Sequence, residues 1–303
     1  MAVVTQTSWA KAVWPGVNKF YGQTYDEFKI EYTSLFDTSS SKKAFEEDVG
    51  TSGFGLASVV DEGSGITFDT QQQGFTTRYR HTRYGLGFIV TKIAFDDDQY
   101  GVVGAKRAKA LAMSMRQTKE TVGANVYNRA FNSAYTGGDA IQLISTAHVN
   151  VAGGTFSNRL ATDAVLSEAA IEQLIINMGS VTNDRGLKIN VQPQALIVPV
   201  ALTFEAQRIL HTEYRVGTAE NDINALVQMN LLPMGVKVCH YLTSTTAWFV
   251  KTNVSDGMKY WTREDDKFAM DNDFDTDNAK FKATGRYSFG WTDPRALFGT
   301  SGS

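Results

Sequence analysis

Carboxylate side chains recur at alternating positions in one short segment, Asp271-Asn272-Asp273-Phe274-Asp275-Thr276-Asp277-Asn278. Oxygen ligands at this spacing are typical of the start of a calcium-binding loop. The match then fails, because Thr276 stands where an EF-hand needs Gly and Lys282 stands where it needs a bidentate Glu. We therefore predict a solvated acidic loop, and a cation site is the alternative.

A second charge pattern suggests contacts between subunits. Arginines lie in a segment, residues 75–84, in which neither face is apolar, and acids cluster in two other segments. None of these charges has an obvious use within one subunit, so we hypothesise that the arginines of one copy enter an acidic segment of its neighbour. The candidate inter-subunit contacts are Arg78, Arg80, Arg83, Asp96, Asp97, Asp98, Asp271, Asp273, Asp275 and Asp277.

No catalytic or cofactor-binding pattern is found in the sequence. The nucleophile elbow G-x-S-x-G and the phosphate-binding loop G-x-x-x-x-G-K-[ST] are both absent. Cys239 has apolar neighbours, which predicts a buried, inert thiol. The histidines have no spacing suited to a metal; they are His81, His148, His211 and His240. We predict that the protein is not an enzyme and has no metal or cofactor.

The composition restricts the class of protein further. Of the 303 residues 43% are hydrophobic and 20% charged, as in an ordinary folded protein. No run of 18 apolar residues exists, so no membrane-spanning helix is predicted. The single cysteine excludes an internal disulfide framework and fits a reducing compartment. The net charge of −3 argues against a dedicated nucleic-acid binder.

The first 95 residues are predicted to form two extended parts. Residues 1–50 are polar and broken, with a solvated connector at 37–43, and favour an arm that binds another subunit; a helix packed on its own core is the alternative. Residues 51–95 predict a hairpin, in which a long strand over 75–90 turns back from a shorter strand near 66–68. Because residues 75–84 have no apolar face, we expect the hairpin to lie across another subunit.

One long helix is predicted over residues 97–134, with the acids at 96–98 at its N-terminus. At ~1.5 Å per residue it would span roughly 57 Å and act as a structural beam; a coiled coil is the alternative. Gly123 is interpreted as either a bending point or a place of close helix packing. The predicted packing stripe, broken only by Lys119, is Ala105, Ala108, Ala112, Met115, Val122 and Val126.

Residues 165–262 are predicted to form a small α/β unit. We expect Ser167 to cap a helix over 168–178, and we expect a second helix over 202–210. Strands are expected over 195–198, 236–241 and 247–250. The chain then closes with an apolar strand in which Tyr287, Phe289 and Trp291 alternate. Such a strand must pair with a sheet begun earlier, so the domain around the long helix is predicted to be discontinuous.

The order of these parts resembles that of tailed-bacteriophage major capsid proteins of the Hong Kong 97-type fold. The likeness covers residues 95–299 by sequence and the first 95 by arrangement. It implies a mixed α+β fold with an N-terminal arm (1–50), an E-loop hairpin (51–95), a peripheral domain (96–164 and 263–303) that contains the spine helix (97–134), and an axial domain (165–262). The stretches that carry it are Ser145-Thr146-Ala147-His148, Gly153-Gly154-Thr155-Phe156-Ser157-Asn158, Asn221-Asp222-Ile223-Asn224, 271–278, and Trp291-Thr292-Asp293-Pro294-Arg295.

The resemblance implies a subunit that assembles with itself into the pentamers and hexamers of an icosahedral head. The head would enclose double-stranded DNA without sequence-specific binding, which fits the acidic net charge. The expected location is the virion capsid, assembled in the host bacterial cytoplasm without a membrane. Because the chain begins almost directly with its arm, a separate scaffolding protein is expected, together with a portal and decoration proteins. The alternatives are an encapsulin-like nanocompartment shell, a phage attachment or tail protein, and an enzyme of unknown type.

Overall fold

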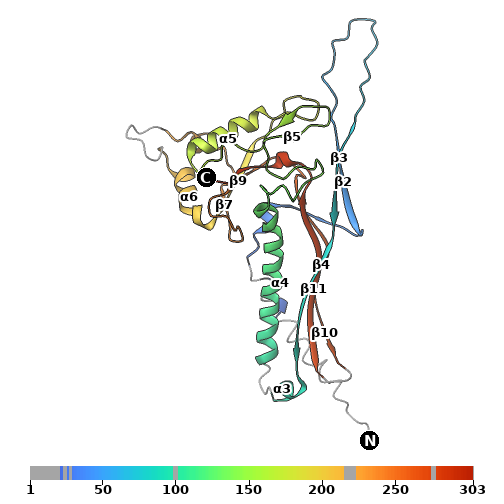
Figure 1. Ribbon diagram of the computed structural model, residues 1–303, viewed down its shortest axis with the longest axis vertical. Helices are drawn as coiled ribbons and strands as arrows, with labels where there is room; N and C mark the ends of the chain where they lie inside the picture. The colour runs from blue at the N-terminus through green and yellow to red at the C-terminus, as the bar shows by residue number, and fades with distance from the viewer. Residues whose placement is uncertain are drawn as a thin grey trace.

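The computed structural model describes residues 21–22, 26, 29–97, 102–214, 223–273 and 278–302. Figure 1 shows an elongated part built from a long helix and long strands, a compact α/β unit to one side, and a strand pair that extends into a projecting loop. The helices are α2 (Tyr32–Leu35), α3 (Lys92–Asp96), α4 (Val102–Asn128), α5 (Glu168–Ser180), α6 (Thr203–His211) and α7 (Ala225–Gln228), with 3-10 turns η1 (Val200–Leu202) and η2 (Pro294–Ala296). The strands are β1 (Asp37–Ser40), β2 (Phe45–Thr51), β3 (Gln73–Arg80), β4 (Thr82–Val90), β5 (His148–Val149), β6 (Thr155–Phe156), β7 (Pro193–Pro199), β8 (Val236–Cys239), β9 (Trp248–Thr252), β10 (Met258–Asn272), β11 (Ala279–Trp291) and β12 (Leu297–Thr300).

The elongated part is a four-stranded sheet, in the order β1-β10-β11-β4, with α4 along one face. Alternate residues of β11 are buried on the helix side, among them Phe281, Ala283 and Tyr287. The predicted closing strand is thus confirmed, and it pairs with β4 as well as with β10. Register shifts in β10 around Glu264 bring Asp266 to an ion pair with Lys119 of α4, with 2.9 Å between Nζ and Oδ2. Lys119 is therefore a buried partner rather than a gap in the helix stripe.

The long helix is shorter than predicted. Asp96 ends the separate helix α3 and Asp97 follows as its C-cap, so in the described residues these acids do not open α4. At the other end α4 stops at Asn128, whose side chain accepts a hydrogen bond from Thr243 N (2.9 Å) and donates to Tyr241 O (3.1 Å). Among the described residues, no helix combines the length and apolar character needed to cross a membrane.

Gly123 is a position of close packing. The helix runs through it without a break, and a Cβ added there would lie 3.2 Å from Phe289 Cε1 of β11. The absent side chain lets α4 approach the sheet, which supports the packing interpretation of this glycine, and the interpretation as a bending point stays a prediction.

The compact unit contains a second four-stranded sheet, in the order β12-β9-β7-β8. Ser167 caps α5 as predicted, with its side chain accepting from Ala170 N. Apolar residues of α5, α6 and the sheet form one core, which includes Leu174, Leu196 and Trp248. Strand β12 was not predicted: after the closing strand the chain continues through η2 and adds an edge strand beside β9. The division into peripheral and axial domains stays a prediction, and this last strand lies in the sheet of the axial unit.

Two predictions for the N-terminal parts are wrong. Residues 37–40 are not a solvated connector, because they form β1 and pair in parallel with β10. Strand β3 pairs with β2, not with residues 66–68, and a break at His81 separates β3 from β4. Tyr32, Leu35 and Phe36 pack into the core beside α4, in favour of the alternative of a segment packed on its own subunit. Much of the predicted arm, residues 1–20, 23–25 and 27–28, lies outside the described residues.

Candidate assembly surfaces

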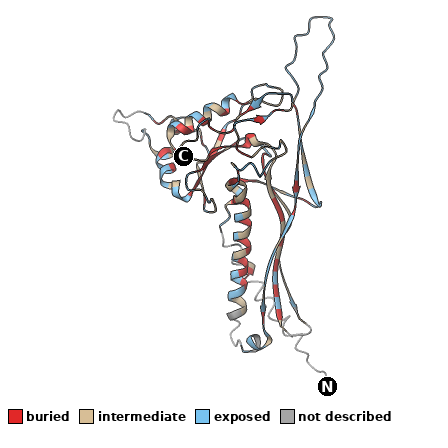
Figure 2. Ribbon diagram, viewed as in Figure 1, coloured by how far each residue is buried: buried red, intermediate tan, exposed pale blue. Residues whose placement is uncertain are grey.

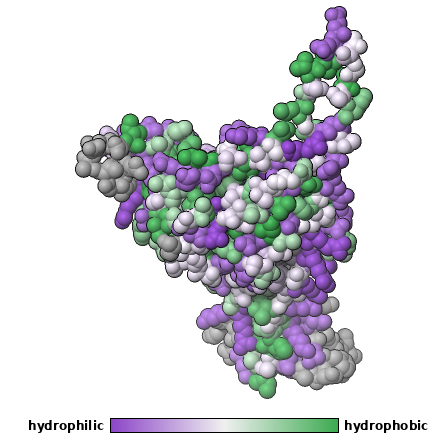
Figure 3. Space-filling model, turned by 45° about the horizontal axis from the view of Figure 1, so that its top comes forward, coloured by the Kyte–Doolittle hydropathy of each residue, from purple (hydrophilic) through white to green (hydrophobic). Residues whose placement is uncertain are grey.

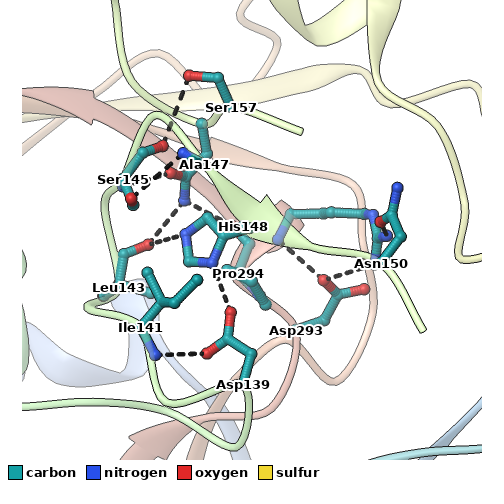
Figure 4. Close-up of polar contacts among 12 residues, drawn as sticks. Asp139, Ile141, Leu143, Ser145, Ala147, His148, Asn150, Ser157, Asp293 and Pro294 are labelled. Carbon is teal, nitrogen blue, oxygen red and sulfur yellow. Dashed lines mark hydrogen bonds and ion pairs between the residues drawn. The ribbon is translucent and has the colours of Figure 1, made fainter. Parts of the chain in front are cut away.

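A buried polar junction joins the two main parts of the subunit (Figure 4). Asn158 is fully buried and holds three segments together. Its Oδ1 accepts from Ser145 N (2.8 Å), and its Nδ2 donates to Leu143 O (2.7 Å), Pro294 O (3.0 Å) and Leu297 O (3.0 Å). The amide therefore fixes the point where the chain leaves β11 and enters β12.

His148 and Arg295 complete this junction. His148 is fully buried, with Nδ1 2.6 Å from Asp139 Oδ2 and its ring stacked on Phe156. The guanidinium of Arg295 lies over the Phe156 ring, with Cζ 4.2 Å from the centroid of that ring. It also donates to Asn150 Oδ1 (2.7 Å) and Asp184 Oδ1 (3.0 Å). Three of the motif stretches, 145–148, 153–158 and 291–295, thus meet in one place.

The loop between β2 and β3, residues 53–72, contains the most exposed large apolar side chains among the residues that the structure describes. It projects beyond the body and is exposed along its length (Figure 2), and hydrophobic and hydrophilic residues alternate on it (Figure 3). Large apolar side chains that are exposed to water cost free energy, and contiguous exposed apolar patches mark interaction sites. The exposed apolar residues of this loop are Phe54, Leu56, Val59, Val60, Ile66 and Phe68, and the last of these is 95% exposed.

Hydrogen bonds between its two arms, and one ion pair to the body, hold the loop in one shape. Ser52 N donates to Gln72 O (2.9 Å), Gly55 N donates to Asp69 Oδ2 (2.8 Å), and the hydroxyls of Ser58 and Thr67 lie 2.7 Å apart. Asp69 also forms an ion pair with Arg185, in the turn after α5. Arg185 and then the N–H groups of Gly55 and Thr70 lower the pKa of Asp69 to about 2, so this connection between loop and body is charged over most of the pH range.

A second exposed apolar area covers the outer end of the α/β unit. It surrounds α6 and α7, whose inward side chains Ala206, Ile209 and Leu226 are buried. Asn224 positions α7: its Oδ1 accepts from Leu226 N (3.1 Å) and its Nδ2 donates to Ile209 O (2.6 Å). The outward residues are Val200, Phe204, Ile223, Met229 and Met234. This surface was not predicted from the sequence, although Phe204, an apolar residue of α6 outside its buried side, signals it.

The predicted arginines are placed on the projecting strands, and one of them already has a partner. Arg78 forms an ion pair with Glu47 of the adjacent β2, so the premise that it has no use within its own subunit is wrong. Arg80 and Arg83 are exposed, and within the described residues neither forms an ion pair. The role of these arginines between subunits stays a prediction.

The predicted acids are only partly described. Asp273 pairs with Lys280 at 3.0 Å, so the premise of an unused charge is wrong there also. Asp271 lies opposite Lys280 in the β10–β11 register, and Asp96 and Asp97 lie at the end of α3. Asp98, Asp275 and Asp277 lie outside the described residues, as does the centre of the proposed cation loop. Across the residues that are described, no group of three or more His, Cys, Asp or Glu side chains could hold a metal ion.

Cys239 is buried and free. Burial raises the pKa of its thiol to about 11, which keeps the group protonated and unreactive, as expected for a core residue.

Comparisons with known proteins identify one family by sequence and similar folds among solved structures. Residues 74–299 match the sequence model of a family described as "Phage capsid protein". A comparison with curated protein sequences finds no match. Among solved structures, the capsid of a native GTA particle aligns with a TM-score of 0.54 at 12% identity, over 90% of each chain. Microbacterium phage Oxtober96 aligns with a TM-score of 0.53 at 9% identity, over 91% of this chain and 93% of that one. The virus-like particle from Pyrococcus furiosus aligns with a TM-score of 0.52 at 9% identity, over 94% and 97%.

Proposed function

The chain belongs to the phage capsid protein family, and from this premise we propose that it is the major head protein of a tailed phage. It assembles with itself into the pentamers and hexamers of an icosahedral shell that encloses double-stranded DNA. The observation that carries the proposal is the family match, because it extends from β3 through α4 and the α/β unit to β12. No enzymatic step is part of this function.

The exposed apolar surfaces support a subunit that is completed by its neighbours. The loop of residues 53–72 presents apolar side chains that its own subunit leaves uncovered, and the area around α6 and α7 does the same at the opposite side of the molecule. We propose that the loop lies across an adjacent copy and that the outer end of the α/β unit packs around the symmetry axis of each ring. Many such contacts per subunit allow each one to be weak and reversible during assembly.

Arg80 and Arg83 are proposed to bind an acidic segment of a neighbouring copy, in the segments around Asp96 or Asp271. Reversing both to Glu is expected to block assembly and to leave the subunit folded, because both side chains are exposed. Arg78→Glu is the comparison variant, since that residue serves the β2–β3 pair of its own subunit. Normal assembly of the Arg80→Glu/Arg83→Glu variant would remove the arginines from the interface.

The function is tested by expressing the full chain alone and together with candidate scaffold genes, followed by negative-stain electron microscopy. We expect closed shells or sheets of hexamers. A matched variant carries Ser or Asn at Val59, Val60, Ile66 and Phe68, which are exposed and leave the core untouched. This variant should fold as the wild type does and fail to form shells. Enclosure of the genome, the scaffold, the portal, decoration proteins and assembly in the host cytoplasm belong to the same proposal.

An encapsulin-like nanocompartment is the second candidate, because the likeness to the virus-like particle extends over nearly the whole of both chains. The two kinds of shell differ in content. Purified particles that protect double-stranded DNA from nuclease would support the phage head, and particles that contain a protein cargo instead would support the nanocompartment.

A further inference from the structure

One face of the long sheet is turned away from α4, and basic side chains gather at its centre. In the antiparallel part of this sheet, β10-β11-β4, the register places His81, Ser288 and Trp261 in one row across β11, and Arg83, Arg286 and Glu264 in the next row. Alternation along the strands puts both rows on the face opposite the buried Tyr287. Arg263 stands in the irregular step between Thr262 and Glu264. Three arginines and a histidine therefore share one small area, and one of them, Arg83, is also proposed above to bind an acidic segment of a neighbouring copy.

This area has more hydrogen-bond donors than acceptors. Among buried polar atoms, Arg263 Nε, Trp261 Nε1 and His81 Nε2 have no hydrogen-bond partner in the part of the chain that is described. The first two can only donate. Arg286 Nε reaches His81 O at 3.2 Å, and Ser288 Oγ lies 3.1 Å from His81 Nδ1. Buried donors without acceptors are costly and rare, so this cluster indicates a missing acceptor.

The charges point the same way. Arg83 and Arg286 face each other directly across two strands, an arrangement in which like charges destabilise a sheet. Burial, and after it the positive charge of Arg286, lowers the pKa of His81, with Arg263 adding to this effect. Three carboxylates lie nearby. Glu264 pairs with Lys267 at 3.0 Å, which lowers its pKa, as do the charges of Arg83 and Arg263; Asp265 accepts from the Thr262 hydroxyl, and Glu46 binds Lys43 and the Ser41 hydroxyl. The positive charge therefore lacks a full counter-charge within the described residues.

We propose that this arginine-rich area, defined by Arg83, Arg263, Arg286, Trp261 and His81, is a binding site for an oxyanion. A phosphate or a carboxylate supplies several acceptor oxygens and negative charge together, whereas a water molecule could accept two of the hydrogen bonds but would leave the arginine charges unbalanced. The ligand enters beside Arg83, which is exposed, and next to Gly85, which has no side chain to block the approach. The oxyanion comes from free phosphate or from a carboxylate that a second copy presents.

The test uses the unassembled full-length subunit and inorganic phosphate as the probe. Phosphate is titrated by calorimetry against sodium chloride of equal ionic strength. We expect saturable binding of phosphate, with affinity at least tenfold lower in Arg263→Gln and in Arg286→Gln. Arg208→Gln, which changes an exposed arginine on α6, is the matched control and should bind as the wild type does. Trp261→Phe keeps an aromatic ring, removes the unpaired N–H and should also weaken binding. It serves as the test if the arginine variants prove to be unfolded.

Two results would overturn the proposal. One is that phosphate binds no better than chloride; the other is that Trp261→Phe and every arginine variant that folds bind phosphate with the affinity of the wild type. Assembled shells then distinguish the two sources of the oxyanion. Phosphate that binds the subunit but no longer binds the shell indicates that a neighbour's carboxylate fills the site. Phosphate that binds both to the same extent indicates a site for the free ion. Either result in the shell supports an oxyanion site, and the proposed shell function is tested separately by microscopy.

Discussion

Loss of one partner of the buried ion pair between Lys119 and Asp266 should destabilise the subunit more than loss of one partner of a surface pair. Lys119 Nζ lies 2.9 Å from Asp266 Oδ2, and the two side chains are 4% and 1% exposed. Removing one partner of a buried pair takes a close counter-ion away from the charge that remains in the interior, which costs about 3–5 kcal/mol. We expect Lys119→Met and Asp266→Leu each to lower the free energy of unfolding by this amount.

The double variant separates the loss of the pair from the cost of an isolated charge. Lys119→Met/Asp266→Leu buries no charge, so it should lose far less stability than the sum of the two single variants, with a coupling of at least about 2 kcal/mol. The surroundings constrain the size of the new side chains, because a Cβ at Gly285 would lie 1.9 Å from Asp266 Oδ1. Leu is chosen for position 266 because its side chain branches at Cγ as that of Asp does, with two methyl groups in place of the two carboxylate oxygens.

The measurement is urea unfolding of the unassembled full-length subunit, followed by circular dichroism. Lys267→Met is the matched control: its pair with Glu264 is 69% and 40% exposed, so it should change the free energy of unfolding by no more than about 1 kcal/mol. The reasoning fails if the two single variants resemble this control, or if their effects simply add in the double variant.

Four further predictions concern Asn158, Gly123, Asp69 and Cys239. Asn158→Ala removes four hydrogen bonds from a fully buried junction and should cost on the order of 3 kcal/mol in urea unfolding. The control Asn132→Ala removes one exposed hydrogen bond, from Ala134 N, and should cost no more than about 1 kcal/mol; an equally small loss for Asn158→Ala would contradict the prediction. Gly123→Val should crowd Phe289, 3.2 Å from the added Cβ, and cost about 1–3 kcal/mol by the same measurement; unchanged stability would show that α4 has room to move. Because Asp69 has its pKa lowered from 3.8 to about 2, its ion pair with Arg185 is fully formed above about pH 4 and is lost as the pH falls through about 2; carboxyl titration by NMR should show this value and its return towards 3.8 in Arg185→Gln. Cys239, with a pKa of about 11, should react with a thiol reagent at pH 8 only after unfolding, and rapid labelling of the folded subunit would show that the thiol is accessible.

Local sequence patterns predicted the compact parts of this fold well. The helix capped by Ser167 and the apolar strand around Leu196 depend on neighbouring residues, and their bounds were close to those observed. The turn at Gly153 and Gly154 is also set locally, since both residues adopt positive φ, which glycine permits. The expectation of a phage head fold came from the order of parts and from short stretches that meet at the junction around Asn158.

Pairings between distant segments were not predictable in the same way. The partner of β3 could be chosen only by tertiary contacts, because residues 66–68 and β2 are both acceptable strands in sequence. Lys119 looked like a break in the helix stripe, since its partner Asp266 lies in an irregular part of β10 that no local pattern marks. The oxyanion site was missed for this reason too: Arg263 and Arg286 join Arg83 only through the register of three strands.

The central claim is that this chain builds a shell by covering its neighbours, and a cryo-electron microscopy reconstruction of the assembled full-length protein tests it most directly. The account predicts closed icosahedral particles in which residues 53–72 of each subunit lie on an adjacent copy and α6 and α7 surround the five-fold and six-fold axes. Particles in which residues 53–72 contact no second copy would contradict the proposed assembly, and a chain that stays monomeric with every scaffold would contradict the claim itself.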